Sequence, residues 1–256
     1  MPLTETSTNK TVVKSVELLN LFLTNSRLTL TEMVQLLQAP KTSVYRMARS
    51  LEDMGFLTKG PDNKYALGLL FLQFGKLVSE RLEVRHVALP IMKRLRDEVD
   101  EAVNLIIPDG GDAIYIEKLD TNHPVRVYTQ VGRRAPMYAG ACPRILLTHL
   151  PEEELERYLA RTELLPFASG TITDRYHLRE VLDESRRTGY TVSHSELEDH
   201  TSAVAAPIRD HSGLVIAGLS IAGPTSRFQA EHLPPLVEAC VQGAQEISMA
   251  LGWRAT

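Results

Sequence analysis

Three successive amphipathic segments with helical periodicity occupy the first part of the chain. The first has its apolar positions at Val12, Val16, Leu19 and Leu23, with Thr11 as N-cap, and ends at the turn-forming residues 25–26. The second opens with a capping box, Thr29 and Glu32, and places Leu30, Met33, Val34 and Leu37 on one stripe. The third follows Pro40, has its apolar positions at Val44, Met47, Ala48, Leu51 and Met54, and stops near Gly55. We expect three short helices around a common core.

The polar face of the third segment suits a polyanion. Thr42, Tyr45, Arg46 and Arg49 share that face, and no acidic residue occurs between positions 39 and 51. Backbone charge supplies much of the affinity of proteins for nucleic acid, so the pattern favours a DNA-recognition helix over an ordinary amphipathic surface helix. Asp53 lies farther along the segment, where we expect it not to interfere.

A basic hairpin is predicted directly after these helices. Residues 56–59 and 64–67 flank the turn-forming sequence 60–63 and place Lys59 and Lys64 near the tip. Three short helices followed by such a hairpin is the layout of a winged helix-turn-helix, whose third helix enters the major groove. The predicted DNA contacts are Lys41, Thr42, Ser43, Tyr45, Arg46, Arg49, Lys59 and Lys64.

Residues 68–80 form a segment that is apolar around nearly its whole circumference. Its apolar residues are Leu69, Leu70, Phe71, Leu72, Phe74, Leu77 and Val78. A helix of this kind must be buried on several sides, and a partner subunit explains that better than a small neighbouring core does. A homodimer formed here would set two recognition helices about one DNA turn, roughly 34 Å, apart.

The remaining pattern mixes helices with antiparallel strands. A helix is expected from Val84 to Val99, bent or restarted at Pro90, followed by strands at 103–108, 113–118 and 126–130. Helices are expected at 142–150, 151–160 and 175–188, strands at 204–209 and 214–221, and a closing helix through Leu236, Cys240, Ile247 and Leu251. The expected fold class is therefore α+β, with an N-terminal winged helix-turn-helix, a linker helix and a C-terminal antiparallel sheet flanked by helices.

Charge and composition support this division. The chain has 256 residues and a formal net charge of −4. Residues 1–75 carry eight Lys/Arg and six Asp/Glu, or +2, which leaves −6 for the rest. Two cysteines cannot build a disulfide framework, and neither a signal peptide nor a membrane-length apolar run is present, so a cytoplasmic protein without membrane partners is expected.

Catalytic, cofactor and metal motifs are weak. Cys142 with His149, or Ser220 with a histidine, would be a nucleophile and a base, but no G-x-S-x-G elbow occurs. Nucleotide-binding glycine loops are missing, and the histidines at 194, 200 and 211 lack a metal-ligand spacing. We expect no catalytic residues, no metal and no cofactor.

Small residues lead directly into a predicted helix at 132–144. Free backbone N–H groups at the start of that helix would suit a carboxylate or another small anion, and a tight packing turn without a ligand is the equal alternative.

These motifs together resemble an IclR-type transcriptional regulator along nearly the whole chain from Thr11. The resemblance rests on residues 28–33, 40–46, 55–56, 65–68, 203–208 and 221–224, in this order. It implies a winged-helix DNA-binding domain, a linker helix, a GAF-like or PAS-like effector domain, and homodimers that often pair into tetramers. Such regulators usually control catabolic genes and are more often repressors than activators.

The resemblance also implies an effector pocket. Carried over by position, it would involve Met137, Gly140, Ala141, Cys142, Ser193, Ala203, Ser220 and Ala222. Some members that bind small keto acids have an acidic residue at the position of Ser193, a Cys at that of Ala203 and a Ser at that of Ala222. Here Pro143-Arg144 replaces a Gly-Lys that is frequent at the start of the pocket helix. Fewer polar groups imply a less polar or larger pocket, suited to a larger carboxylate, a sugar-acid derivative or an aromatic compound.

The sequence thus predicts a ligand-responsive regulator that binds a palindromic operator as a dimer or tetramer and represses a catabolic operon. A transcriptional activator is the first alternative, and an enzyme fused to a DNA-binding domain is the second. The expected domains are a disordered tail (1–10), a winged helix-turn-helix (11–67), a linker and dimerisation helix (68–83) and an effector-binding domain (84–256).

Overall fold

The chain divides into two compact units, Met1–Arg81 and Leu82–Thr256. The structure is a computed structural model that describes residues 9–80, 83–124, 126–127 and 129–254. Most of the predicted tail therefore lies outside the described residues, whereas Lys10 already belongs to the first helix.

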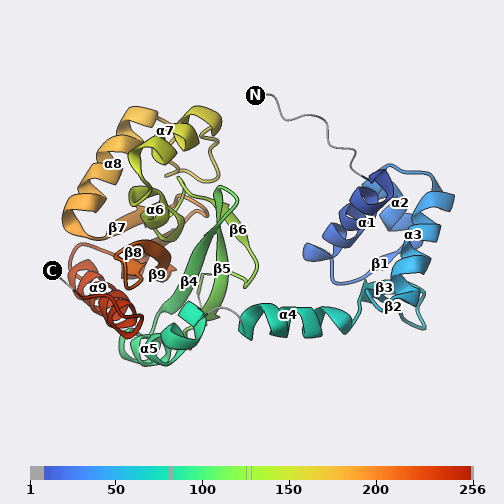
Figure 1. Cartoon of the computed structure of the whole chain (residues 1–256), viewed down its shortest axis with the longest axis horizontal. Coiled ribbons are helices and arrows are strands. Elements are labelled where there is room, and N and C mark those ends of the chain that lie inside the picture. The colour runs from blue at the N-terminus through green and yellow to red at the C-terminus, as the bar shows by residue number, and fades with distance from the viewer. Residues whose placement is uncertain (1–8, 81–82, 125, 128, 255–256) are drawn as a thin grey trace. The chain divides into compact units, whose positions relative to one another are not determined.

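The first unit is a small helical bundle with a three-stranded sheet (Figure 1). Its elements are α1 (Lys10–Asn20), η1 (Leu21–Leu23), β1 (Leu28–Thr29), α2 (Leu30–Leu37), α3 (Lys41–Asp53), β2 (Leu57–Lys59), β3 (Lys64–Leu67) and α4 (Leu70–Glu80). The strands lie in the order β1-β3-β2, so the predicted hairpin is present and gains a strand that the sequence reading omitted. Its first pair joins Leu28 to Tyr65.

Local capping sets the start of α2. The Thr29 hydroxyl accepts from the Glu32 N–H at 3.3 Å, and the Glu32 carboxylate accepts from the Thr29 N–H at 2.7 Å. The predicted capping box is confirmed, and these hydrogen bonds hold the pKa of Glu32 below its usual value. This geometry fixes the start of α2, the helix that precedes α3.

The predicted cap of the first helix is wrong, and of its predicted stripe only Leu19 packs against the core. The N-cap is Asn9, whose side chain accepts from the Thr11 N–H at 3.0 Å. The buried apolar residues are Leu18 and Phe22, whereas Val12 is 58% exposed. The helix carries two apolar stripes at helical spacing, and the one with larger side chains is the one that packs against the core.

The third helix matches its pattern closely, and the fourth forms where it was predicted. Four of the five predicted apolar residues of α3 are buried, but Met54 is exposed because the helix ends at Asp53 and Gly55 takes a left-handed φ of +79°. In α4, Phe71 and Phe74 pack against Phe56. Leu69, Leu72 and Leu77 are exposed.

The second unit is a six-stranded antiparallel sheet between two groups of helices. Its helices are α5 (Glu83–Val99), α6 (Ala141–Thr148), α7 (Glu152–Arg161), α8 (Arg175–Thr188) and α9 (Leu233–Ala250), with a short turn η2 (Thr225–Arg227). Its strands are β4 (Ala102–Asp109), β5 (Asp112–Leu119), β6 (Arg134–Pro136), β7 (Thr191–His194), β8 (Thr201–Arg209) and β9 (Val215–Pro224), in the order β6-β5-β4-β9-β8-β7.

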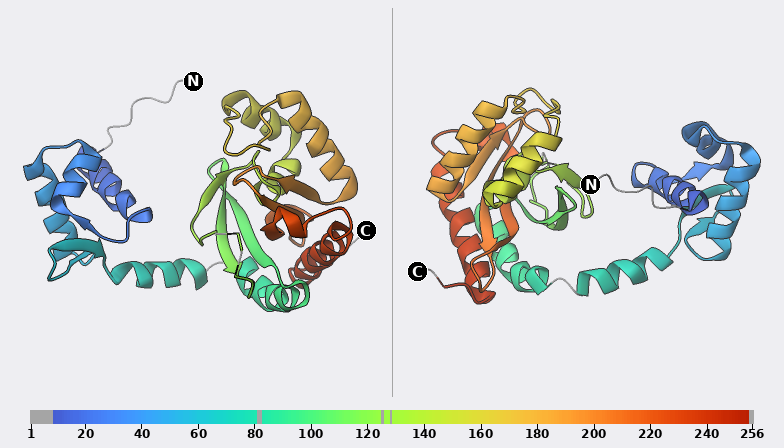
Figure 2. Two further views of the ribbon diagram at one scale, coloured as in Figure 1. Left: turned by 180° about the vertical axis from the view of Figure 1, so that it is seen from behind. Right: turned by 45° about the horizontal axis from the view of Figure 1, so that its top comes forward.

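Each face of this sheet has its own apolar core. Figures 1 and 2 show α5 and α9 along one side of the sheet and α6 and α8 along the other. Val103 and Leu105 of β4 pack into the cluster beneath α5 and α9, whereas Ala205 of β8 belongs to the cluster beneath α6 and α8. The α5 helix continues through Pro90. The α+β class is confirmed.

One predicted strand of this unit is wrong, and its two edge strands were not predicted. Residues 126–127 and 129–130 are not in a strand, and Tyr128 lies outside the described residues. The sheet edge is instead made by β6, and the opposite edge by β7, which the sequence reading omitted. Residues 126–130 have strand-forming side chains, but Lys118 Nζ and Arg133 bind the backbone and side chain of Thr129 within a loop.

Among the helices that the structure describes, none combines the length and the apolar character needed to cross a membrane.

Candidate functional site

The exposed face of α3 carries the predicted DNA contacts. Lys41, Thr42, Tyr45, Arg46, Arg49 and Lys59 are exposed, and Ser43 and Lys64 are half-buried. Buried Val44 and Leu51 fix the opposite face of the helix in the core. The α3 residues among them therefore form a surface that faces away from the core, and none of the eight is buried.

The hairpin lies beside this surface. Leu57 joins the same core as α3, and the Lys59 ammonium lies 5.4 Å from the centre of the Tyr65 ring. The expectation that Asp53 does not interfere is wrong in one respect, because its carboxylate lies 3.4 Å from Arg49 Nε. Both side chains are more than 60% exposed, so the pair contributes little and leaves Arg49 able to exchange partners.

A pocket in the second unit collects most of the predicted effector residues. It opens where α6 begins, between the sheet and the loop 195–200. Of the eight predicted residues, those on its wall are Gly140, Ala141, Cys142, Ser193, Ala203, Ser220 and Ala222. Its cavity volume is about 50 Å³, well below the range of about 300–1,000 Å³ usual for small-molecule sites, so a ligand larger than a few waters requires the wall to open.

Strand register explains why these residues meet. Ser193 pairs with Ala203, and Ala203 pairs with Ala222, so one row crosses β7, β8 and β9. Ser220 precedes Ala222 by two positions and therefore faces the same side. Asn104 of β4 pairs with Ser220 and extends the polar wall.

Met137 does not belong to this pocket. It is buried in the core beneath α6 and α8 and lines a separate groove next to α7 and the turn between β4 and β5. Its apolar side chain packs into that core, away from the pocket. The position of Met137 in the sequence, three residues before Gly140, does not reveal this orientation.

Asn104 is a pocket residue that the sequence reading missed. The residue is 4% exposed, and its Nδ2 donates to Ser220 Oγ at 3.4 Å. Its Oδ1 has no hydrogen-bond partner among the described residues. A buried polar atom without a partner costs free energy, so a ligand with a donor group would relieve that cost. A lone Asn inside the apolar run 102–107 was the available signal.

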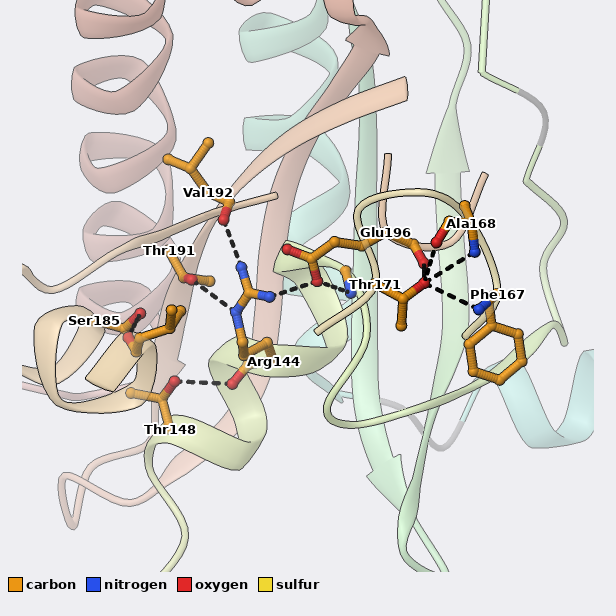
Figure 3. A network of polar contacts seen from close by, with 11 residues as sticks. Arg144, Thr148, Phe167, Ala168, Thr171, Ser185, Thr191, Val192 and Glu196 are labelled. Carbon is orange, nitrogen blue, oxygen red and sulfur yellow. Dashed lines mark hydrogen bonds and ion pairs between the residues drawn. The ribbon is translucent and has the colours of Figure 1, made fainter. Parts of the chain in front are cut away.

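A buried ion pair supports the start of α6. Arg144 and Glu196 have side chains that are 1% and 5% exposed, and Arg144 Nη1 lies 2.5 Å from Glu196 Oε2 (Figure 3). Arg144 also donates to the Thr191 hydroxyl and to the Val192 carbonyl of β7. Each nitrogen of this guanidinium thus donates to an acceptor, and the Glu196 carboxylate balances its charge.

Glu196 also reaches the pocket. Its Oε2 accepts from the Gly140 N–H at 2.9 Å, and its carbonyl accepts from the Thr171 hydroxyl at 2.6 Å. Gly140 has a φ of +81°, and an added Cβ would lie 2.8 Å from Leu197. Pro143 has no N–H. Ala141 and Cys142 therefore supply the N–H groups that remain for a ligand at the start of α6.

A second ion pair borders the opening. Arg133 Nη1 lies 2.7 Å from Glu198 Oε1, and both residues line the pocket. Their side chains are 31% and 41% exposed. A ligand carboxylate at this rim would contact the Arg133 guanidinium, whose present partner, the Glu198 carboxylate, is partly solvated.

Cys142 and His149 do not form a nucleophile and base. They are separated by two turns of α6, or roughly 10 Å. Burial raises the pKa of the Cys142 thiol to about 12, so the thiol stays protonated near neutral pH. Burial, with Arg209 and Arg186 nearby, lowers the pKa of His149 to about 4.

His149 should make the second unit less stable in acid. Between pH 6.5 and 4 the unfolded chain binds a proton at this residue while the folded chain does not, so the free energy of unfolding falls as the pH falls. We expect a loss of about 2 kcal/mol over this window, after allowance for the partial exposure of the ring. Urea unfolding at pH 7, 5.5 and 4 would measure it. The variant His149→Gln should lack this component, and equal pH dependence in both proteins would contradict it.

No group of three or more potential metal ligands occurs in the described ranges of the chain. His194, one of the histidines considered above, instead has its Nδ1 2.8 Å from the Ser202 hydroxyl.

Two family models match the chain. The model for the IclR helix-turn-helix domain covers residues 11–61, and the model for the C-terminal domain of bacterial transcriptional regulator IclR covers residues 76–249. These matches include α1 to α3 and the whole pocket described above.

Individual relatives agree with the models. The chain is 53% identical over 245 residues to the HTH-type transcriptional regulator KipR of Bacillus subtilis, covering 96% of this chain and 98% of KipR. It is 31% identical over 220 residues to the HTH-type transcriptional repressor AllR of Escherichia coli, covering 86% and 81%.

A solved structure extends the similarity to the fold. The IclR homologue of Microbacterium hydrocarbonoxydans, solved in complex with 4-hydroxybenzoate, superposes with a TM-score of 0.82 at 28% identity, covering 94% of this chain and 98% of that one. These relatives are transcriptional regulators and not enzymes. The chain belongs to the IclR family of transcriptional regulators.

Proposed function

We propose that the protein is a ligand-responsive repressor of a catabolic operon, acting in the cytoplasm. The proposal rests on one observation: the chain has an exposed basic helix in its first unit and a partly buried polar pocket in its second. Similarity to AllR of Escherichia coli, a transcriptional repressor, supports repression, and activation is the alternative outcome at a promoter.

The DNA-reading role falls to α3. Its first and central turns expose Thr42, Arg46 and Arg49, side chains that donate to phosphates and base edges. Lys59 and Lys64 of the hairpin would neutralise the neighbouring backbone, as in other winged helices.

Homodimerisation is proposed through α4. Leu69 is 79% exposed, Leu72 69% and Leu77 59%, and these residues are close together on a short segment. A monomer that left them in water would expose an unusually apolar helix. A dimer covers them and presents two recognition helices to a palindromic operator, and pairs of dimers would give tetramers.

The pocket is proposed to bind a small carboxylate or aromatic acid. The N–H groups of Ala141 and Cys142 suit the carboxylate, and Asn104 Oδ1 suits a hydroxyl or N–H donor elsewhere on the ligand. The 4-hydroxybenzoate bound by the Microbacterium homologue has both groups. Ligand binding would favour one arrangement of the DNA-binding units, to the extent that it binds the arrangements with different affinity.

A thermal-shift screen of the full chain against organic, sugar and aromatic acids tests the ligand-responsive role. A true ligand at 100 times its Kd stabilises the folded state by about 2.7 kcal/mol, which raises Tm measurably. The variant Asn104→Leu should lose the shift, whereas Gln242→Leu, an exposed amide on α9, should keep it. If no compound shifts Tm and none alters DNA binding, the protein regulates without a ligand from this pocket.

A further inference from the structure

A second basic surface lies beside the recognition helix, in the groove between α1 and α3. Its wall includes Lys10 and Lys14 from α1 and Thr42, Ser43, Arg46 and Ser50 from α3. None of the residues that line this groove is acidic. The groove therefore combines three cations with hydroxyl groups, which are the side chains that bind DNA phosphates.

The two lysines are positioned to act together. Lys10 and Lys14 are four residues apart and so lie one above the other on the same face of α1. Both are exposed, and no carboxylate within the described ranges forms an ion pair with either. Arg27 and Arg49, in contrast, face Asp62 and Asp53. The positive charge of this part of α1 is thus available to an external anion.

The groove and the hairpin lie on opposite flanks of α3. Around the helix, Ser43 and Ser50 lie on the flank toward α1, and Tyr45 and Glu52 lie on the other flank. Tyr45 and Glu52 are near Tyr65 of the hairpin. Burial is the main reason that the pKa of Tyr65 is raised, and the charges of Glu52 and Tyr45 raise it further. Arg46 and Arg49 lie between the two flanks. The predicted contacts include Ser43 on the flank toward α1 but no residue of α1 itself.

We propose that Lys10 and Lys14 bind the phosphates of the DNA strand that borders the major groove on the side away from the hairpin. A helix in the major groove has a phosphate backbone on each side, because the groove is about 12 Å wide and bounded by the two strands. The hairpin lysines serve one strand and the α1 lysines the other. This inference rests on the proposed placement of α3 in the major groove.

The salt dependence of binding to a random-sequence DNA duplex tests the inference with the full-length protein. Each phosphate neutralised adds roughly 0.9 to the slope of log K against log salt. The double variant Lys10→Gln/Lys14→Gln should therefore lower the slope by roughly 1.8 and reduce the affinity lost between 50 and 200 mM salt by roughly 12-fold. Each single variant should give about half of the slope change.

Two comparisons separate this inference from the proposed function. Lys93→Gln removes one charge from an exposed position in the second unit and should leave the slope unchanged. Lys59→Gln tests the hairpin flank. If Lys59→Gln lowers the slope but the α1 variants do not, the α1 site is refuted while DNA reading by α3 stands. If none of these variants alters DNA binding, the placement of α3 fails as well. Unchanged thermal unfolding would show that every variant is folded.

Discussion

Replacing Arg144 with methionine will lower the free energy of unfolding of the second unit by about 3–5 kcal/mol. The substitution leaves the Glu196 carboxylate buried without its cation, and it also leaves the Thr191 hydroxyl and Val192 carbonyl without their donor. Methionine fills most of the volume, so the cost comes from the stranded charge and not from a cavity. Urea unfolding at neutral pH measures the effect.

The double variant Arg144→Met/Glu196→Gln separates charge from packing. The glutamine amide oxygen at position 196 would still accept from the Gly140 N–H, and no buried charge would remain. We expect this protein to recover more than half of the stability that Arg144→Met loses. Equal instability of the single and double variants would show that the guanidinium acts through its contacts with β7 alone.

Arg46→Ala will reduce binding to the preferred operator by about 1–3 kcal/mol, or roughly 5- to 150-fold, and relax specificity at one base pair. Arg46 is exposed at the centre of the face that α3 turns away from the core, where it would reach a base edge. The operator can be obtained by selecting duplexes from a random library with the unmodified protein. Affinities for the selected duplex and a scrambled one then give the change.

The ratio of the two affinities decides the role of Arg46. Arg94→Ala, an exposed arginine of the second unit, should leave both affinities unchanged. A loss of the same size on both duplexes would make Arg46 a phosphate contact and contradict base reading. No loss on either would remove it from the DNA-binding surface.

Sequence periodicity predicted the buried face of a helix correctly where the helix has only one apolar stripe. Val44, Met47, Ala48 and Leu51 allow a single buried face for α3, and the capping box at Thr29 fixes the helix before it. In α1 the valines at 12 and 16 compete with Leu18 and Phe22, and periodicity cannot rank two stripes of the same spacing. Packing against α2 and α3 decides between them, which is a tertiary effect.

The pocket shows what sequence reasoning could and could not reach. Its wall from Gly140 to Cys142 and the row Ser193, Ala203 and Ala222 were found by resemblance. Arg144 and Glu196 were not, because charged residues are rarely buried and these two are 52 positions apart. Their pairing depends on the register of β7 and on the loop 195–200, and neither can be read from local pattern.

Strand β4 has a further consequence for how a bound ligand can be sensed. Asn104 faces the pocket, while its two chain neighbours Val103 and Leu105 pack beneath α5 and α9. The ligand-facing atom and the helix-facing side chains thus belong to three consecutive residues, which two planar peptide units join. We expect a ligand that moves Asn104 to be sensed at the packing of α5 through the backbone of β4 itself.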